Sequence, residues 1–135
     1  GLSFKPSTDD MREAPSRVLM EALWEAGAEV RAYDPEAMDE TRRLYPDQAG
    51  LTLCESAYEA LDGADALVIV TEWQEFRSPD FQAIKEKLAD GVVMDGRNLY
   101  EPGTVESLGL KYYAIGRGRG TNIPRPNYGR RSTDN

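Results

Sequence analysis

The chain has 135 residues, of which 40% are hydrophobic and 30% are charged, and its formal net charge is −8. This length predicts one domain with a substantial core, and the ordinary composition indicates a globular protein. The negative charge argues against nucleic acid as a partner, because surfaces that bind nucleic acid are basic. The chain has no histidine and only one cysteine. We therefore expect neither a transition-metal site nor an internal disulfide, which fits a reducing cytoplasm.

The first residues, Gly-Leu-Ser-Phe, include neither an initiator methionine nor the basic and apolar regions of a signal peptide. No apolar run approaches the ~20 residues that span a bilayer, so no membrane segment is expected. We therefore expect the chain to be an excised piece of a longer cytoplasmic protein.

Short strands and amphipathic helices alternate along the sequence. The run Ala-Leu-Val-Ile-Val at 66–70 is continuously apolar, as in a parallel strand covered on both faces. The expected strands cover residues 1–4, 29–33, 51–54, 66–70, 92–94 and 111–115. The expected helices cover residues 15–26, 37–45, 56–63 and 101–109, and a further helix starts at Ser78-Pro79.

This alternation predicts an α/β fold: a doubly wound, mainly parallel, Rossmann-like sheet with helices on both faces. In the favoured strand order 3-2-1-4-5-6, the first and fourth strands are neighbours, and ligands bind beyond their carboxyl ends. A usual strand has ~5–6 residues, whereas only residues 1–4 remain for the central one. We therefore expect residues upstream of Gly1 to complete it.

Three candidate residues follow neighbouring strands at this ligand-binding edge. Lys5 follows the first strand, Glu72 the fourth and Arg97 the fifth. A lysine ammonium suits a phosphate or a uracil carbonyl, and the planar guanidinium suits bidentate recognition of phosphate. Gly96 would let the backbone approach a ligand closely. The alternative for both cations is a solvated loop residue.

Other conspicuous residues favour structural roles. Trp73 is more typical of packing than of direct ligand contact, and Asp34-Pro35 is read as a turn that ends a strand. No G-x-G-x-x-G follows the first strand, so we do not expect NAD to bind in the usual Rossmann manner. Cys54 is expected to be a small buried hydrophobic residue, because no histidine is present to act as its base.

The opening GLSFKPSTDDMREAPS, together with Tyr33-Asp34-Pro35, Thr71-Glu72-Trp73 and Asp95-Gly96-Arg97-Asn98, carries a resemblance that covers roughly residues 1–116. These motifs resemble the C-terminal UDP-binding domain of UDP-glucose 6-dehydrogenases, in the UDP-glucose/GDP-mannose dehydrogenase family. The resemblance implies that Phe4, Lys5 and Arg97 bind the UDP-sugar. It also implies that Arg12 reaches the pyrophosphate of an NAD held mainly by another domain. From the residues alone, a salt bridge from Arg12 to Asp9, Asp10 or Glu13 is the alternative.

By the same resemblance, the intact enzyme oxidises UDP-glucose to UDP-glucuronate with two NAD⁺ and a covalent thiohemiacetal intermediate. The family's cysteine nucleophile motif and NAD fingerprint are absent from this chain. We therefore expect no catalytic residue here and no activity from the chain alone. Its partners would be the UDP-sugar and the remaining domains of an enzyme that forms a homo-oligomer.

We divide the chain into a UDP-binding domain, residues 1–116, and a flexible tail, residues 117–135, which is rich in Gly, Arg, Pro and Asn. Two alternatives remain open. The domain could belong to a dehydrogenase of another UDP-sugar, such as UDP-N-acetylmannosamine. It could also be a non-catalytic α/β interaction module whose crevice is unused.

Overall fold

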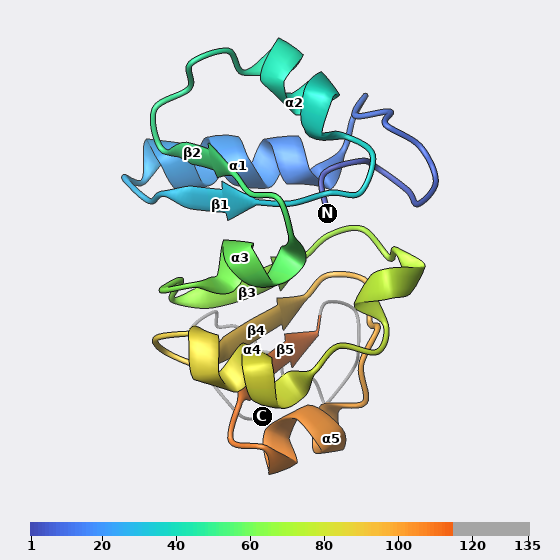
Figure 1. Cartoon of the computed structure of the whole chain (residues 1–135), viewed down its shortest axis with the longest axis vertical. Helices are drawn as coiled ribbons and strands as arrows, with labels where there is room; N and C mark the ends of the chain where they lie inside the picture. The colour runs from blue at the N-terminus through green and yellow to red at the C-terminus, as the bar shows by residue number, and fades with distance from the viewer. Residues whose placement is uncertain (115–135) are drawn as a thin grey trace.

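The structure, a computed structural model, describes residues 1–114, in which helices and parallel strands alternate (Figure 1). The helices are α1 (Pro15–Glu25), α2 (Met38–Leu44), α3 (Ala57–Leu61), α4 (Phe81–Lys87) and α5 (Pro102–Ser107), with a 3₁₀ turn η1 (Gln74–Phe76). The strands are β1 (Val30–Ala32), β2 (Leu51–Leu53), β3 (Ala66–Ile69), β4 (Val92–Asp95) and β5 (Lys111–Ala114). The predicted tail, residues 117–135, lies outside the described residues.

The strands form two parallel half-sheets. β1 pairs with β2, and β3, β4 and β5 pair in that order. These pairings confirm the predicted α/β fold and match the order 3-2-1-4-5-6 with its central strand left out. The half-sheets lie one above the other in Figure 1, and the arrows of their strands point to the same side.

The prediction of a strand at residues 1–4 is wrong for the described chain, because this segment pairs with no strand. Instead, the backbone N–H groups of Leu2 and Ser3 donate to the carboxylate of Asp34, at 2.6 and 3.0 Å. An apolar pattern cannot anticipate this outcome, because a side chain takes the place of the ladder partner.

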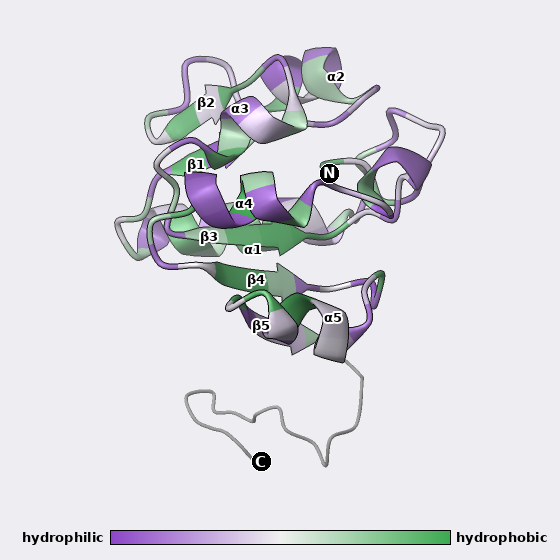
Figure 2. Ribbon diagram, turned by 60° about the horizontal axis from the view of Figure 1, so that its bottom comes forward, coloured by the Kyte–Doolittle hydropathy of each residue, from purple (hydrophilic) through white to green (hydrophobic). Residues whose placement is uncertain are grey.

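Each half-sheet has a hydrophobic core of its own. The first core joins α1, α2 and the β1–β2 pair, and Leu2 and Met20 are buried in it. The second joins α3, α4 and α5 with β3, β4 and β5, around the fully buried Val93 and Val105. Figure 2 shows the hydrophobic colouring concentrated on β3 and β4.

Local signals predicted most helix ends closely, and the start of α4 is the exception. The hydroxyl of Ser56 accepts from the Glu59 N–H at 3.0 Å and caps the helix that was expected from residue 56. The helix expected from Ser78 begins instead at Phe81, because Asp80 is its cap and accepts from Ala83 N–H. On α1 the buried residues are Ser16 and Met20, and Val18 is 73% exposed.

Among residues 1–114, no helix is long and apolar enough to cross a membrane. The same residues contain no cluster of ligating side chains that could hold a metal ion.

Candidate functional site

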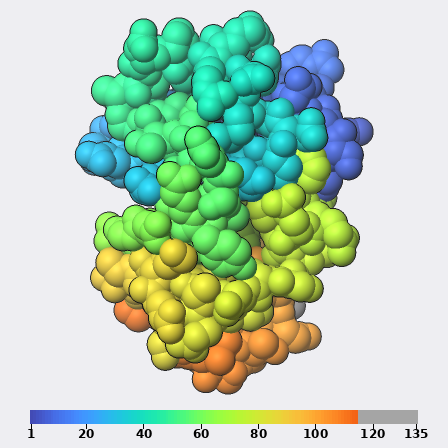
Figure 3. Space-filling model, viewed as in Figure 1, coloured from blue at the N-terminus to red at the C-terminus, as the bar shows by residue number. Residues whose placement is uncertain are grey.

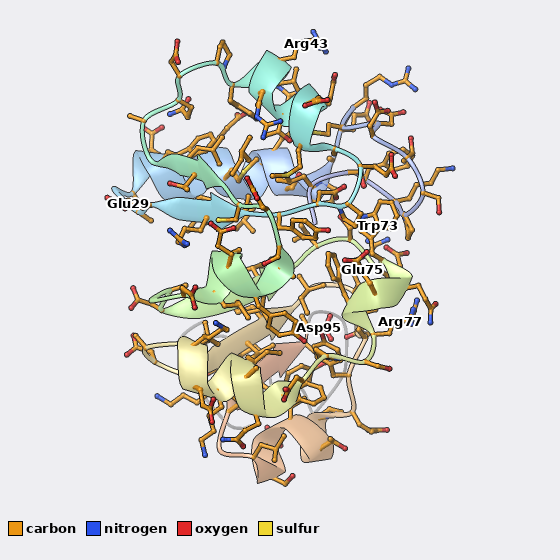
Figure 4. The ribbon with its side chains drawn as sticks, viewed as in Figure 1. Glu29, Arg43, Trp73, Glu75, Arg77 and Asp95 are labelled. Atoms are coloured by element: carbon orange, nitrogen blue, oxygen red, sulfur yellow. The ribbon has the colours of Figure 1, made fainter. Side chains whose placement is uncertain are left out.

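The carboxyl ends of the strands bring several loops to one edge of the molecule, and the predicted site residues lie on these loops. Figure 4 shows labelled residues of this edge, Trp73, Glu75 and Asp95, on the side toward which the strands point. Parallel strands bring their carboxyl ends to the same edge, and ligands of open α/β folds bind there.

The segment that carries Phe4 and Lys5 is fixed to both half-sheets. In the first half-sheet, Asp34 accepts from the backbone of Leu2 and Ser3. In the second, the Thr71 hydroxyl donates to the Ser3 carbonyl at 2.5 Å. All four residues are buried. The start of the Lys5 loop is therefore held at the junction of the two halves.

Beyond Ser3 the chain forms an exposed loop that presents a cation. The Phe4 N–H donates to the Asp10 carbonyl at 3.0 Å and closes the loop. The Ser3 hydroxyl donates to the Lys5 carbonyl at 2.9 Å. The Lys5 ammonium lies 5.5 Å from the centre of the Phe4 ring, within cation–π range. Phe4 and Lys5 therefore form one unit, with the ammonium open to solvent.

Arg12 is engaged by Asp10, one of the three partners considered from the sequence. Its Nε and Nη2 donate to the carboxylate at distances of 2.7–3.2 Å. The hydrogen bonds from Arg12 lower the pKa of Asp10 to about 2. The Arg12 side chain is 89% exposed. It therefore faces solvent.

Arg97 is held by two carboxylates at the end of β4. Its backbone N–H donates to the buried Asp95 at 3.0 Å. Its guanidinium makes a two-bond contact with Glu72, from Nε and Nη2, at 3.0 and 3.1 Å. The hydrogen bonds from Arg97 hold the pKa of Glu72 below its usual value. Glu72 thus fixes the orientation of the guanidinium.

Gly96, just before Arg97, has a structural reason to be glycine. A Cβ there would lie 2.9 Å from the Ile69 carbonyl oxygen, and the Gly96 N–H donates to that oxygen at 2.8 Å. The close approach expected at Gly96 is therefore made to β3, within the protein.

The contacts of Asp34 and Trp73 support the structural roles that the sequence predicted for them. The Asp34 carboxylate also accepts from the N–H groups of Glu36 and Ala37 and from the Trp73 indole, at 2.8–3.2 Å. Burial alone would raise the pKa of Asp34, but the backbone hydrogen bonds outweigh it, and the pKa lies below its usual value. Asp34 is therefore a charged anchor that joins the two halves.

Strained backbone is concentrated near the candidate residues. Among residues 1–114, four non-glycine residues have a positive φ, and three of them, Ser7, Glu13 and Asn98, lie in the loops that carry Lys5, Arg12 and Arg97. Such conformations persist only where surrounding contacts hold them, and they are enriched at binding sites.

The structure places Lys5 and Arg97 on the same edge, but in separate clusters. Lys5 lies with Phe4 and Asp10, and Arg97 with Glu72. Within residues 1–114, no ion pair joins the two clusters. The sequence did not reveal that Glu72 pairs with Arg97, because the two residues are 25 positions apart.

Cys54 is buried, as expected. Burial raises the pKa of its thiol, so the reactive thiolate is disfavoured at neutral pH. The thiol is a packing group here.

Known proteins match this chain over most of its length. The chain is 53% identical over 122 residues to a UDP-glucose 6-dehydrogenase of Pseudomonas aeruginosa, covering 88% of the chain and 27% of that relative. It is 46% identical over 117 residues to a UDP-glucose 6-dehydrogenase of Rhizobium meliloti, covering 87% and 26%. The chain therefore spans about a quarter of the length of these relatives.

Solved structures share the fold. An NDP-N-acetyl-D-galactosaminuronic acid dehydrogenase from Methanosarcina mazei matches with a TM-score of 0.74 and 27% identity, over 93% of this chain and 25% of that one. A UDP-glucose dehydrogenase from Pyrobaculum islandicum matches with a TM-score of 0.62 and 35% identity, over 73% and 21%. The model of the family described as "UDP-glucose/GDP-mannose dehydrogenase family, UDP binding domain" matches residues 1–102. The chain therefore belongs to the UDP-glucose/GDP-mannose dehydrogenase family, and it carries that family's UDP-binding domain.

Proposed function

We propose that this chain is the UDP-sugar-binding domain of a UDP-glucose 6-dehydrogenase, in which Phe4, Lys5 and Arg97 hold the substrate. The observation that carries the proposal is the position of the two cations. Lys5 and Arg97 stand on separate loops, each fixed by a buried aspartate, Asp34 or Asp95, at the ligand-binding edge.

The local chemistry of these cations suits a diphosphate. The chain as a whole carries a net charge of −8, so an anionic ligand needs locally placed positive groups. The Lys5 ammonium is exposed and can adapt to the ligand, whereas the Arg97 guanidinium is already oriented by Glu72. A diphosphate oxygen would bind the donors of Arg97 that remain beside the Glu72 contact, because guanidinium has five N–H donors.

The choice of UDP-glucose among UDP-sugars rests on the relatives. Those named above at 53% and 46% identity are UDP-glucose 6-dehydrogenases. Dehydrogenases of other nucleotide sugars share the fold at lower identity. The parent enzyme would oxidise UDP-glucose to UDP-glucuronate, and its other domains would supply the nucleophile and most of the NAD site.

The described residues do not fit NAD as a dinucleotide held in the Rossmann manner. α1 begins with Pro15, no side chain caps it, and no glycine-rich turn precedes it. Arg12, exposed on its loop, would reach the pyrophosphate of an NAD bound by another domain. This domain would therefore contribute substrate binding, which accelerates the reaction by fixing the part of the substrate remote from the reacting carbon.

The same proposal includes three further points. Residues 1–116 form the UDP-binding unit, the protein is cytoplasmic, and the parent enzyme is a homo-oligomer. The competing function is an interaction module with no nucleotide site. UDP should raise the melting temperature of this chain more than an equally charged phosphate without a nucleoside. Equal shifts would favour the interaction module.

The sharper test is a calorimetric titration of UDP into the full-length parent and its variants. Charge-assisted hydrogen bonds contribute about 1.5–3 kcal/mol each. Lys5→Ala and Arg97→Ala should therefore each weaken UDP about tenfold to a hundredfold. Arg97→Lys should not restore the affinity, because lysine lacks the planar fork.

Matched controls are Lys87→Ala and Arg42→Ala, which remove a lysine and an arginine from surface ion pairs elsewhere on the fold. Both should leave the affinity unchanged. Uridine, which lacks phosphates, should depend much less on Arg97 than UDP does. Wild-type affinity in both Lys5→Ala and Arg97→Ala, with folding intact, would contradict the proposal.

A further inference from the structure

The residues that follow β3, from Thr71 to Phe76, bridge the two half-sheets at the ligand-binding edge. They leave the second half and contact the first, where Trp73 Nε1 donates to the Asp34 carboxylate at 3.2 Å. The ring of Tyr33, which follows β1, packs edge-on against Phe76, with the ring centres 6.4 Å apart. Figure 3 shows this segment, in yellow-green, against the blue and cyan residues of the first half. We call this segment the bridge.

The bridge is also fixed to the second half. Near its start, Glu72 makes the two-bond contact with the Arg97 guanidinium. At its end, the Phe76 carbonyl accepts from the Tyr100 hydroxyl at 2.6 Å. Tyr100 is buried, and its own N–H donates to Asp95, whose carboxylate also holds the Arg97 N–H. Both ends of the bridge are therefore tied to the loop that presents Arg97.

The middle of the bridge meets the Lys5 loop at a single oxygen atom. Asp34 Oδ2 accepts from the Trp73 indole, and the same atom accepts from the Leu2 and Ser3 N–H groups. The Ser3 hydroxyl lies 3.3 Å from this oxygen and 2.9 Å from the Lys5 carbonyl. A continuous series of contacts therefore joins the two cationic loops through the bridge.

This connection matters for a ligand that contacts both cations. Lys5 and Arg97 lie in separate clusters, so the protein fixes their separation through its own structure. A ligand with two phosphates can contact both cations at once, whereas a ligand with one phosphate contacts one of them. Preorganising the two groups lowers the entropic cost of binding only for the ligand that uses both. The bridge therefore favours a diphosphate over a monophosphate.

We propose that Trp73 is a positioning residue that sets the spacing of Lys5 and Arg97 and makes the site selective for a nucleoside diphosphate over a monophosphate. This inference rests on the proposed function, because it takes these two cations as the phosphate-binding groups. Trp73 acts on the Lys5 loop through Asp34, and its neighbour Glu72 acts on Arg97. Figure 4 shows Trp73 where the two halves meet.

The test is a calorimetric titration of UDP and of UMP into the full-length parent and its Trp73→Phe variant. Phenylalanine keeps an aromatic ring in place but has no N–H to donate to Asp34. We expect the affinity for UDP to fall about threefold to tenfold, and the affinity for UMP to fall by less than about twofold. A purely structural loss would weaken both nucleotides equally and leave the ratio of their affinities unchanged.

Trp24→Phe is the matched control. The Trp24 indole also donates to a protein oxygen, the Gly50 carbonyl at 2.9 Å, but this contact lies within the first half. The ratio of UDP affinity to UMP affinity should therefore stay at the wild-type value in Trp24→Phe.

A second variant changes the other end of the bridge. Tyr100→Phe removes the hydroxyl that donates to the Phe76 carbonyl, and it should lower the ratio of UDP affinity to UMP affinity in the same way. Its control is Tyr45→Phe, which removes a hydroxyl that contacts Glu21 on the surface of the first half. Where Trp73→Phe does not fold, the result for Tyr100→Phe decides.

The outcomes separate this inference from the proposed function. An unchanged affinity ratio in folded Trp73→Phe would overturn the inference, and so would an equal fall of the ratio in Trp24→Phe. The proposed function would still stand if Lys5→Ala and Arg97→Ala weaken UDP. If those two variants bind UDP as the wild type does, the proposed function fails, and the inference fails with it.

Discussion

The two half-sheets use a buried aspartate at the carboxyl end of a strand in different ways. Asp95 accepts from Arg97, Leu99, Tyr100 and Tyr112, all of which belong to its own half. Its role is to shape the loop that presents Arg97.

Asp34 instead links the halves. Besides its own loop, it holds the backbone of Leu2 and Ser3 and the indole of Trp73, which follows β3. Thr71 adds a bond to Ser3 across the same junction. The halves are therefore joined by polar contacts at the ligand-binding edge and separated by a cavity behind it. Among the described residues, the geometry of the site depends on these side-chain contacts between the halves.

The largest effect is expected from Asp34→Asn. The asparagine side chain would place its own NH₂ group, a donor, where the Asp34 carboxylate now accepts hydrogen bonds. Each buried donor left unpaired costs about 1–3 kcal/mol. We expect a loss of about 3 kcal/mol or more in the free energy of unfolding, measured by urea denaturation.

Asp95→Asn is the matched control for that variant. It should also destabilise the protein, but it should leave the fluorescence of Trp73 at its native wavelength, because Trp73 bonds to Asp34. A native Trp73 signal in Asp34→Asn would contradict the role of Asp34 at the junction.

Part of the Asp34 contribution depends on pH. Its pKa is lowered in the folded state, so the unfolded chain binds its proton first as the pH falls. The stabilisation is present above the unfolded pKa of ~3.9 and is lost as the pH falls through the folded value. Denaturant melts between pH 6 and pH 3 should show a shallower decline for Asp34→Asn than for the wild type. Parallel declines would show that another carboxyl group governs acid unfolding.

Thr71→Val tests the second contact across the junction. Valine has the same shape but cannot donate to the Ser3 carbonyl, so the loss should be about 1–2 kcal/mol. Thr41→Val is the control. The Thr41 hydroxyl donates to the Ala37 carbonyl, but that carbonyl also accepts from the Thr41 N–H and stays paired in the variant. A larger loss for Thr41→Val than for Thr71→Val would count against the junction.

The smallest effect concerns the orientation of Arg97. Glu72→Gln removes the charge that holds the guanidinium, and we expect UDP affinity in the full-length parent to fall about threefold to tenfold, or up to about 1.4 kcal/mol. Arg97→Ala should lower it further. In a Glu72→Gln, Arg97→Ala double variant, the Glu72 change should have no additional effect. Additive losses would mean that Glu72 acts independently of Arg97.

The sequence predicted the fold class because short-range patterns determine it. The apolar run at 66–70 and the turn at Asp34-Pro35 placed β3 and the end of β1 close to their observed positions. Helix starts were predictable where a single cap was available, as at Ser56. They failed at Ser78 because Asp80, two residues later, competes for the same role.

The sequence predicted at which edge of the sheet the site lies, but it did not predict which side chains pair there. Strand order alone placed Lys5 and Arg97 at the carboxyl edge. The pairing of Arg97 with Glu72 and the many donors around Asp34 join residues far apart in the chain. No local pattern reports such contacts. The cavity between the half-sheets could be anticipated only from the shortness of residues 1–4, and its lining only from the folded chain.

We expect one UDP molecule to bind the loops of both halves. The most direct test is a titration of UDP into ¹⁵N-labelled chain, observing the backbone amides of Lys5 and Arg97 together. We expect both amides to shift and to saturate with the same dissociation constant, and we expect the amide of Arg42, an exposed residue of α2, not to move. A saturable shift at only one of the two loops, or at neither, would contradict this expectation.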